Sequence, residues 1–160
     1  MPIFVVRPDD PEPDQLLPDV LPKVCSNEPS FLHRSLIYLW VLPTSLFALP
    51  VMACNLLYRD SEITYWHGLV EVNGPVVRRI LALGSFRAAA MTLGHVILCY
   101  DEVARQKFRA HELVHVQQAE KWGPLFLPLY LLHAFMIWRK TGNPYWEHPW
   151  EVEARSKSGI

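Results

Sequence analysis

The feature that most restricts the fold of this chain is the spacing of two histidines around an acid in His111-Glu112-Leu113-Val114-His115. Residues four apart lie on one face of an α-helix, so this stretch must be helical if both imidazoles are to meet one ion. Zinc accepts two such nitrogens, and Glu112 lies within the same turn, close enough to take a proton from a water molecule. The motif therefore predicts zinc ligands at His111 and His115 and a general base at Glu112.

The residues around the motif set the limits of its helix. Asp101 or Glu102 can cap the start, and Gly123-Pro124 stops the end, so the helix is predicted to run from about 101 to 122. A core helix that held two imidazoles and a carboxylate without an ion would be costly to bury. That cost favours a metal site over a chance match.

A catalytic zinc site needs a third protein ligand and leaves one position open for water. The metzincin extension requires glycine at 118 and histidine at 121, and this chain has glutamine and lysine there. A glutamate on a second helix is the natural alternative. Glu151 is the preferred third ligand, with Glu153 and His148 as the other candidates.

A second strong feature is the run SLIYLWVLPTSLFALPVMACNLLY, residues 35–58, whose 24 residues carry no formal charge. A helix of that length can cross a hydrocarbon core of about 30 Å. Pro43 and Pro50 would kink the helix, which membrane helices tolerate better than soluble ones. We predict a transmembrane or membrane-associated helix over 35–58, and a buried helical hairpin broken at the prolines is the alternative.

The residues before this run have a different composition. Residues 1–30 contain seven prolines among acidic residues, and they lack the basic start and apolar run of a signal peptide. So little apolar surface cannot offset the entropy of ordering the chain, which predicts a disordered tail. Residues 3–6 can instead pair as a short strand.

The residues after the run form the predicted domain, 60–160. Alternating apolar residues and turn signals predict a small hairpin over 62–73. A further strand is predicted to end near residue 100, and its free edge at Gly94–Leu98 is expected to hold an extended peptide by backbone hydrogen bonds. The apolar run at 125–138 is shorter than a full membrane span. It cannot cross a membrane once if Glu151 joins the two histidines.

The overall composition limits the classes of partner. The chain has 15 lysines and arginines and 16 aspartates and glutamates. This near balance gives no indication of a basic surface that would bind nucleic acid. The three cysteines, Cys25, Cys54 and Cys99, fit neither a disulfide framework nor a zinc knuckle.

Two stretches carry a resemblance to known families. Residues 111–118 followed by Glu151-Val152-Glu153-Ala154 resemble the gluzincin metallopeptidases, and the Glu-x-x-Ala element is similar to the one that carries the third zinc ligand in HtpX-type membrane peptidases. Residues 90–97 with 110–113 resemble the metallopeptidase domain found with extracellular contractile injection systems, where an A-x-T-x-G-x-x-I strand precedes a HEL-x-HV-x-Q helix.

This resemblance implies particular roles. His111, His115 and Glu151 would be zinc ligands, and Glu112 the general base. The HtpX-type pattern continues with an aspartate where this chain has Arg155. A carboxylate that orients a ligand histidine must therefore come from elsewhere, with Glu153 and Glu147 as candidates.

The sequence thus predicts an α+β fold: a minimal zincin-like domain with an active-site helix, a glutamate helix and a small β-sheet, preceded by a hydrophobic helix. The expected function is a membrane-associated zinc metallopeptidase that hydrolyses a peptide or protein substrate. Tyr130 and His148 are candidates for a group that stabilises the developing oxyanion. The alternative is a non-catalytic, membrane-associated zinc protein with a structural or relic zincin site.

Overall fold

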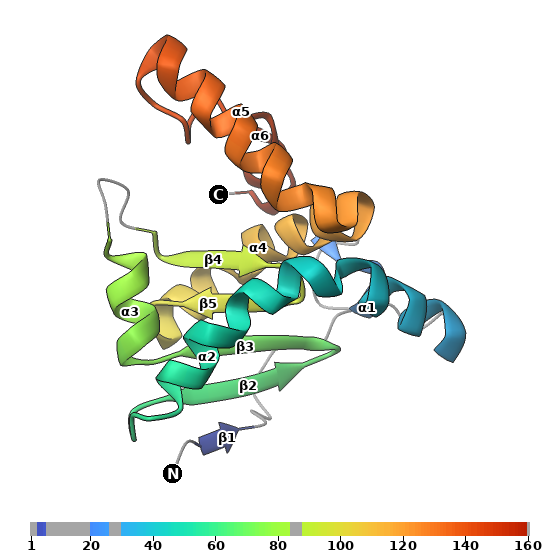
Figure 1. Ribbon diagram of the computed structural model, residues 1–160, viewed down its shortest axis with the longest axis vertical. Helices are drawn as coiled ribbons and strands as arrows, with labels where there is room; N and C mark the ends of the chain where they lie inside the picture. Colours follow the sequence, from blue (N-terminus) through green and yellow to red (C-terminus); the bar gives the residue numbers. More distant parts are fainter. Residues whose placement is uncertain (1–2, 6–19, 26–29, 84–87, 160) are drawn as a thin grey trace.

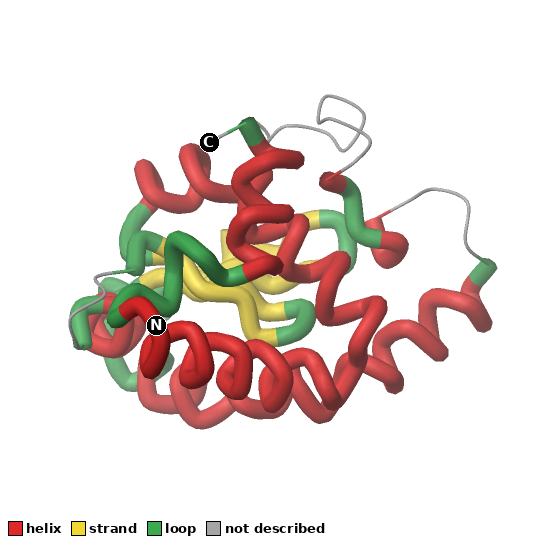
Figure 2. Tube along the Cα trace, turned by 90° about the horizontal axis from the view of Figure 1, so that it is seen from above, coloured by secondary structure: helices red, strands yellow, loops and turns green. Residues whose placement is uncertain are grey.

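The computed structural model describes residues 3–5, 20–25, 30–83 and 88–159 of the 160-residue chain. It has a mixed α+β fold, as predicted, with one sheet in the strand order β1-β2-β3-β5-β4 (Figure 1). Figure 2 shows helices on both sides of this sheet. The strands are β1 (Ile3–Val5), β2 (Glu62–Trp66), β3 (Leu69–Asn73), β4 (Ala90–Leu93) and β5 (Val96–Cys99). The helices are α1 (Phe31–Ser45), α2 (Leu49–Asn55), α3 (Pro75–Leu81), α4 (Glu102–Trp122), α5 (Phe126–Thr141) and α6 (Pro149–Ser158), with 3-10 turns η3 (Lys23–Cys25), η4 (Leu46–Ala48) and η5 (Gly123–Leu125).

The hairpin predicted over residues 62–73 is confirmed, because β2 and β3 pair antiparallel along their full length. Its two-residue turn, His67-Gly68, has positive φ angles of 42° and 97°. Positive φ at both central residues is the mark of a type I′ turn, whose twist matches the strands it joins.

The open edge of the sheet near α4 is β4, which corrects the expectation of a free edge at Gly94–Leu98. β4 and β5 form an antiparallel pair, and β5 then pairs in parallel with β3. Parallel pairing needs a crossover, and the segment that contains α3 provides it between β3 and β4. Since β5 is enclosed on both sides, the unpaired edge within the described part of the chain belongs to β4.

The sheet is the middle of three layers, and both of its faces are covered. Ile97 and Cys99 belong to the buried cluster on the α4 side. Val96 and Leu98 belong to the cluster on the opposite side, together with Ala48 from η4. This alternation is what a period of two residues requires of a strand buried on both faces.

Residues 20–25, which the composition assigns to a disordered tail, lie against α4 instead. Val24 is buried, and the backbone N–H groups of Lys23 and Val24 donate to the carboxylate of Glu120 at 2.6 and 2.9 Å. A short apolar segment is thus ordered because a side chain on α4 satisfies its backbone. Composition averaged over residues 1–30 cannot reveal such a local match.

The structure describes one further part of the predicted tail. Ile3–Val5 forms β1, which pairs in parallel with β2 and realises the short strand that the sequence allowed. The rest of the predicted tail, 1–2, 6–19 and 26–29, lies outside the described residues.

The apolar run predicted as a helix is helical from Phe31 to Asn55, through α1, η4 and α2 in succession. By length and composition it is the one helix within the described ranges that can cross a membrane. The helix is interrupted after Pro43, where η4 separates α1 from α2. Figure 1 shows that the chain runs on along the sheet and does not fold back, so the hairpin alternative is not realised.

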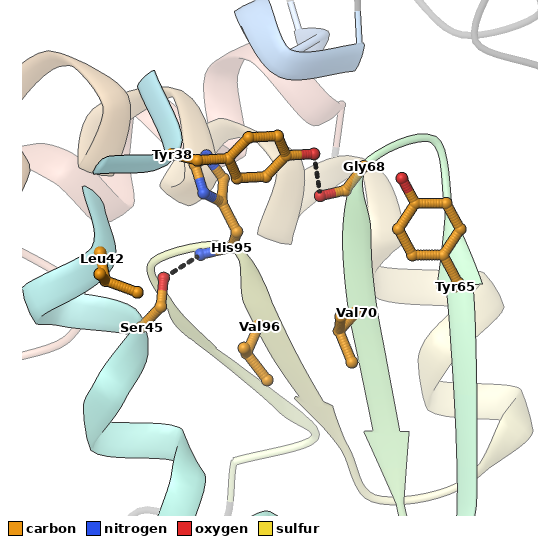
Figure 3. A pocket seen from close by; sticks show the side chains of 8 residues that line it. All are labelled: Tyr38, Leu42, Ser45, Tyr65, Gly68, Val70, His95 and Val96. Carbon is orange, nitrogen blue, oxygen red and sulfur yellow. Dashed lines mark hydrogen bonds between the residues drawn. The ribbon is translucent and has the colours of Figure 1, made fainter. Parts of the chain in front are cut away.

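The inner face of this helix is hydrogen-bonded to the sheet and its loops. The Tyr38 hydroxyl donates to Gly68 O at 2.8 Å, and His95 N donates to Ser45 Oγ at 3.0 Å, beside a cavity of about 430 Å³ (Figure 3). The buried side chain of Asn55 bonds the end of β3 at 2.8 Å and the start of α3 at 3.1 Å. The helix is therefore one layer of the folded domain.

A buried charge network joins α4 to the sheet. Glu71 on β3 accepts from Arg109 Nε and Nη2 at 2.8 and 2.6 Å, and from Arg105 Nη1 at 2.9 Å. All three side chains are at most 3% exposed. Because two arginines separated by one turn share one carboxylate, the network sets the rotation of α4 about its axis. It thereby sets the direction of the helix face that carries His111 and His115.

Candidate metal centre

Helix α4 carries the two histidines, and local sequence explains its limits. Asp101 caps the start by accepting from Ala104 N at 2.8 Å. Gly123, at φ 55°, ends the helix one residue after Trp122. The predicted helix over 101–122 is therefore confirmed to within one residue.

Helix α6 carries the glutamate and packs closely on α4. Pro149 stands in its first turn, where a missing N–H costs nothing, and His148 Nδ1 accepts from Trp150 N at 3.3 Å as the N-cap. Glu151 and Ala154, three residues apart, are both buried on the side that faces α4. Ala154 packs against Val114, and its small side chain permits the close approach that brings Glu151 to the histidines.

The structure brings His111, His115 and Glu151 together in one buried cluster. The two Nε2 atoms are 3.2 Å apart, Glu151 Oε2 lies 3.3 Å from His111 Nε2, and Glu151 Oε1 lies 3.2 Å from His115 Nε2. One possible ligand atom from each of the three residues lies within 4.8 Å of the other two.

These separations fit a tetrahedral metal ion. Ligand atoms about 2.0–2.1 Å from zinc in tetrahedral geometry lie roughly 3.3–3.4 Å apart. Glu151 Oε2 is buried and accepts no hydrogen bond from any described residue. Two imidazole nitrogens and a carboxylate oxygen form a donor set that zinc prefers.

Charges within the cluster shift the pKa values of its members. Burial acts to raise the pKa of Glu151, but the close contacts of its carboxylate with the His111 and His115 imidazoles outweigh it and hold that pKa well below its usual range. Burial acts to lower the pKa of His115, but contact with Glu151 and the charge of Glu112 raise it to about 9. The carboxylate of Glu151 is therefore ionised, as a metal ligand must be.

Tyr130, on α5, also contacts Glu151. Its hydroxyl donates to Glu151 Oε1 at 2.6 Å, and its ring stacks on His148 with 4.2 Å between centroids. Burial and the negative charge of Glu151 raise the Tyr130 pKa above its usual value. The hydroxyl is therefore protonated and can donate a hydrogen bond at the site.

Glu112 faces the edge strand. Its side chain is 5% exposed, and Thr92 Oγ1 on β4 donates to Glu112 Oε2 at 2.7 Å. Burial raises the pKa of Glu112, against the opposing effects of the His115 charge and the Thr92 hydrogen bond. A carboxylate with a raised pKa is a stronger base, which suits a group that accepts a proton from water.

Gln118 is a site residue to which the sequence analysis assigns no role. Its Oε1 lies 2.9 Å from His115 Nδ1, while its Nε2 donates to Trp150 O at 3.1 Å and to Glu153 Oε2 at 3.0 Å. Because an amide oxygen can only accept, His115 Nδ1 carries the proton of this bond. In the neutral ring that a metal ion requires, the lone pair is then on Nε2, on the side of Glu151. The sequence feature that could have identified Gln118 is its position three residues after His115, which places both side chains on the same side of the helix.

The other candidates lie elsewhere. Glu153 bonds Gln118 and Lys157, so it acts on His115 only through Gln118. His148 Nε2 lies 3.1 Å from Tyr130 O, and its Nδ1 caps α6, so both ring nitrogens are engaged. Glu147 is exposed. Arg155 donates to Trp146 O at 2.7 Å and stacks on that indole, away from the cluster.

No protein-family model matches the chain, and comparisons with curated proteins and with solved structures likewise find no match.

Proposed function

We propose that this chain is a membrane-associated zinc metallopeptidase of the gluzincin type, with a zincin-like fold. The observation that carries the proposal is the spacing of 3.2–3.3 Å among the donor atoms of His111, His115 and Glu151. A helix with both histidines, a second helix with the glutamate and a sheet edge beside them support the assignment. The resemblance to the metallopeptidase domain of contractile injection systems agrees with it.

Zinc held by these three side chains would supply Lewis acidity toward water and toward the carbonyl of a scissile peptide bond. Glu112 accepts one proton as water oxygen bonds to the carbonyl carbon, and Thr92 fixes the direction of its carboxylate. When the carbon–nitrogen bond breaks, Glu112 returns that proton to the leaving amine. The products are a free carboxylate and a free amine.

An extended substrate has a binding edge in β4. Its outer side is unpaired in the described structure, and Thr92 on this strand touches Glu112. A peptide added as a further strand would therefore pass close to the general base, held by backbone hydrogen bonds. This moves the substrate edge expected at Gly94–Leu98 to Ala90–Leu93.

An open coordination position favours catalysis over a purely structural metal. Structural zinc sites are closed by four protein ligands. The two residues that would close this site, Glu153 and His148, hold other partners. Association with a membrane is supported by the length and apolar composition of Phe31–Asn55.

The test is hydrolysis of casein and of a fluorogenic peptide by the purified full chain. We expect cleavage that a zinc chelator abolishes and that added zinc restores, with no activity in His111→Ala. Cleavage that persists after chelation and in His111→Ala would show that another group does the chemistry. Bound zinc without cleavage of any peptide would favour the structural alternative.

Replacing Gln118 with leucine is expected to weaken zinc binding by roughly 10–100-fold, because His115 loses the acceptor that fixes its tautomer. Competition with a chromophoric chelator measures this affinity. Gln106→Leu, on the exposed side of the same helix, is the matched control and should bind zinc as the wild type does. Equal affinities for Gln118→Leu and wild type would remove Gln118 from the site.

A further inference from the structure

The outward side of the helix Phe31–Asn55 is lined by large apolar side chains. Leu32, Leu36, Leu39 and Phe47 are between 62% and 72% exposed. Globular domains rarely leave so long an apolar row in water without a partner. Within the described residues, this row is left uncovered.

Helix α5 shows the same pattern. Of its 16 residues, Phe126 is the buried one, while Leu131, Phe135 and Met136 are at least half exposed. A helix of this kind gains little from the core of its own domain, since most helical stability comes from packing an apolar face. We call the outward apolar side chains of Phe31–Asn55 and Phe126–Thr141 the apolar seat.

The two parts of the apolar seat adjoin. Thr44 Oγ1 on α1 donates to Gly123 O at the start of η5, at 2.9 Å. The Trp40 ring lies so close to Gly123 that a Cβ there would stand 2.2 Å from Trp40 Cε2. With α1 and the start of α5 locked together, the two apolar rows belong to one region of the surface.

The charge pattern of the apolar seat fits lipid better than a second copy of the chain. Residues 35–58 and 126–138 contain no charged side chain, and basic residues stand at their limits: Arg34, Arg59, Arg139 and Lys140. Trp40 and Trp138, both about half exposed, lie within the two rows. Apolar rows that contain tryptophan and end in cations are typical of surfaces at the boundary between headgroups and acyl chains.

The bonds on the inner face decide how the helix meets the membrane. Tyr38, Ser45 and Asn55 bond backbone groups of the sheet and its loops, at positions spread from the middle of α1 to the end of α2. Ala48 covers the sheet face opposite α4. A helix that crossed the bilayer would have to break these bonds or draw polar strands into hydrocarbon.

We propose that the chain lies on a lipid bilayer and does not cross it, with α1, α2 and α5 in the plane of the interface and the apolar seat in contact with acyl chains. This inference rests on the membrane association proposed above and is independent of the metal. Both ends of Phe31–Asn55 then lie on the same side of the membrane, together with the candidate metal centre.

The first measurement is flotation of the full chain with vesicles of phosphatidylcholine and phosphatidylglycerol. Leu39 and Leu132 both belong to the apolar seat, and Leu132 is 51% exposed. Leu39→Asp and Leu132→Asp should each lower the partition coefficient between vesicle and water by at least about tenfold. Val103→Asp is the matched control, because Val103 is 73% exposed on α4, outside the apolar seat, and it should float as the wild type does. Circular dichroism confirms that each variant is folded.

The second measurement is the depth of nitroxide labels at positions 32, 39 and 47, introduced singly after Cys54→Ser; Cys25 and Cys99 are buried. The outer two positions are separated by about 22 Å along a helix. An in-plane helix predicts similar, shallow depths for all three, roughly 5–10 Å below the headgroups. A helix that spans the bilayer over Phe31–Asn55 has its midpoint near residue 43. It therefore predicts deep labels at 39 and 47, each about 6 Å from the midplane, and a label at 32 near one surface.

Each outcome separates this inference from the metal proposal. A deep label at 39, or wild-type protein that fails to float, overturns the in-plane arrangement even if zinc is bound. A different result would assign the apolar seat to a second copy of the chain. In that case the wild type forms a dimer in the absence of vesicles and does not float, and Leu39→Asp is a monomer. Flotation with shallow labels in zinc-free protein supports the inference, whatever the fate of the peptidase.

Discussion

Glu112→Gln is expected to lower peptide hydrolysis by roughly 10²–10⁴-fold while zinc stays bound. Glutamine has the same shape and can still accept the hydrogen bond from Thr92, but it cannot take a proton from water. The three side chains of the cluster are unchanged, so metal affinity should hold. Steady-state kinetics with a fluorogenic peptide and metal analysis of the same samples give both quantities.

The control for this variant is Glu147→Gln, the same chemical change at an exposed position outside the site. It should retain wild-type kcat/KM. Wild-type activity in Glu112→Gln would remove Glu112 from the chemistry. Loss of activity together with loss of zinc would assign Glu112 a role in holding the site together.

Glu71→Ala is expected to reduce the free energy of unfolding by about 3–5 kcal/mol, the second large effect. The substitution removes the carboxylate that Arg105 and Arg109 share, and it leaves two buried guanidinium groups without that counter-charge. Urea unfolding of metal-free protein, followed by circular dichroism, measures the change. If the alanine variant does not fold, Glu71→Gln, which keeps the volume, should show the same direction of change.

Glu102→Gln is the comparison, because Glu102 also pairs with Arg105 but its side chain is 31% exposed. An ion pair that solvent reaches contributes about 1 kcal/mol or less. Equal losses for Glu71 and Glu102 would mean that burial of the Glu71 network is not what stabilises the position of α4.

The parts of the fold that depend on local sequence were predictable. Asp101 and Gly123 mark the ends of α4 because capping and positive φ are local requirements. Pro149 marks the start of α6 for the same kind of reason. Glu151 could be predicted as the third member of the cluster because glutamate is a common zinc ligand and this one lies near the start of that helix.

The remaining features depend on contacts between distant residues. The position of β4 at the edge follows from the parallel pairing of β5 with β3, which no local pattern reveals. Thr92 meets Glu112, and Glu120 orders residues 20–25, only once α4 packs on the sheet. The composition of residues 35–58 gives their average hydrophobicity, but it does not show which face of the helix is hydrogen-bonded to the domain.

The central claim is that His111, His115 and Glu151 hold one zinc ion. Metal analysis of the purified full chain after dialysis against metal-free buffer tests it most directly. The wild type and Glu112→Gln should retain about one zinc ion per chain, while His115→Ala and Glu151→Ala should lose it without unfolding. A wild-type chain that binds no zinc, or variants that keep it, would contradict the account.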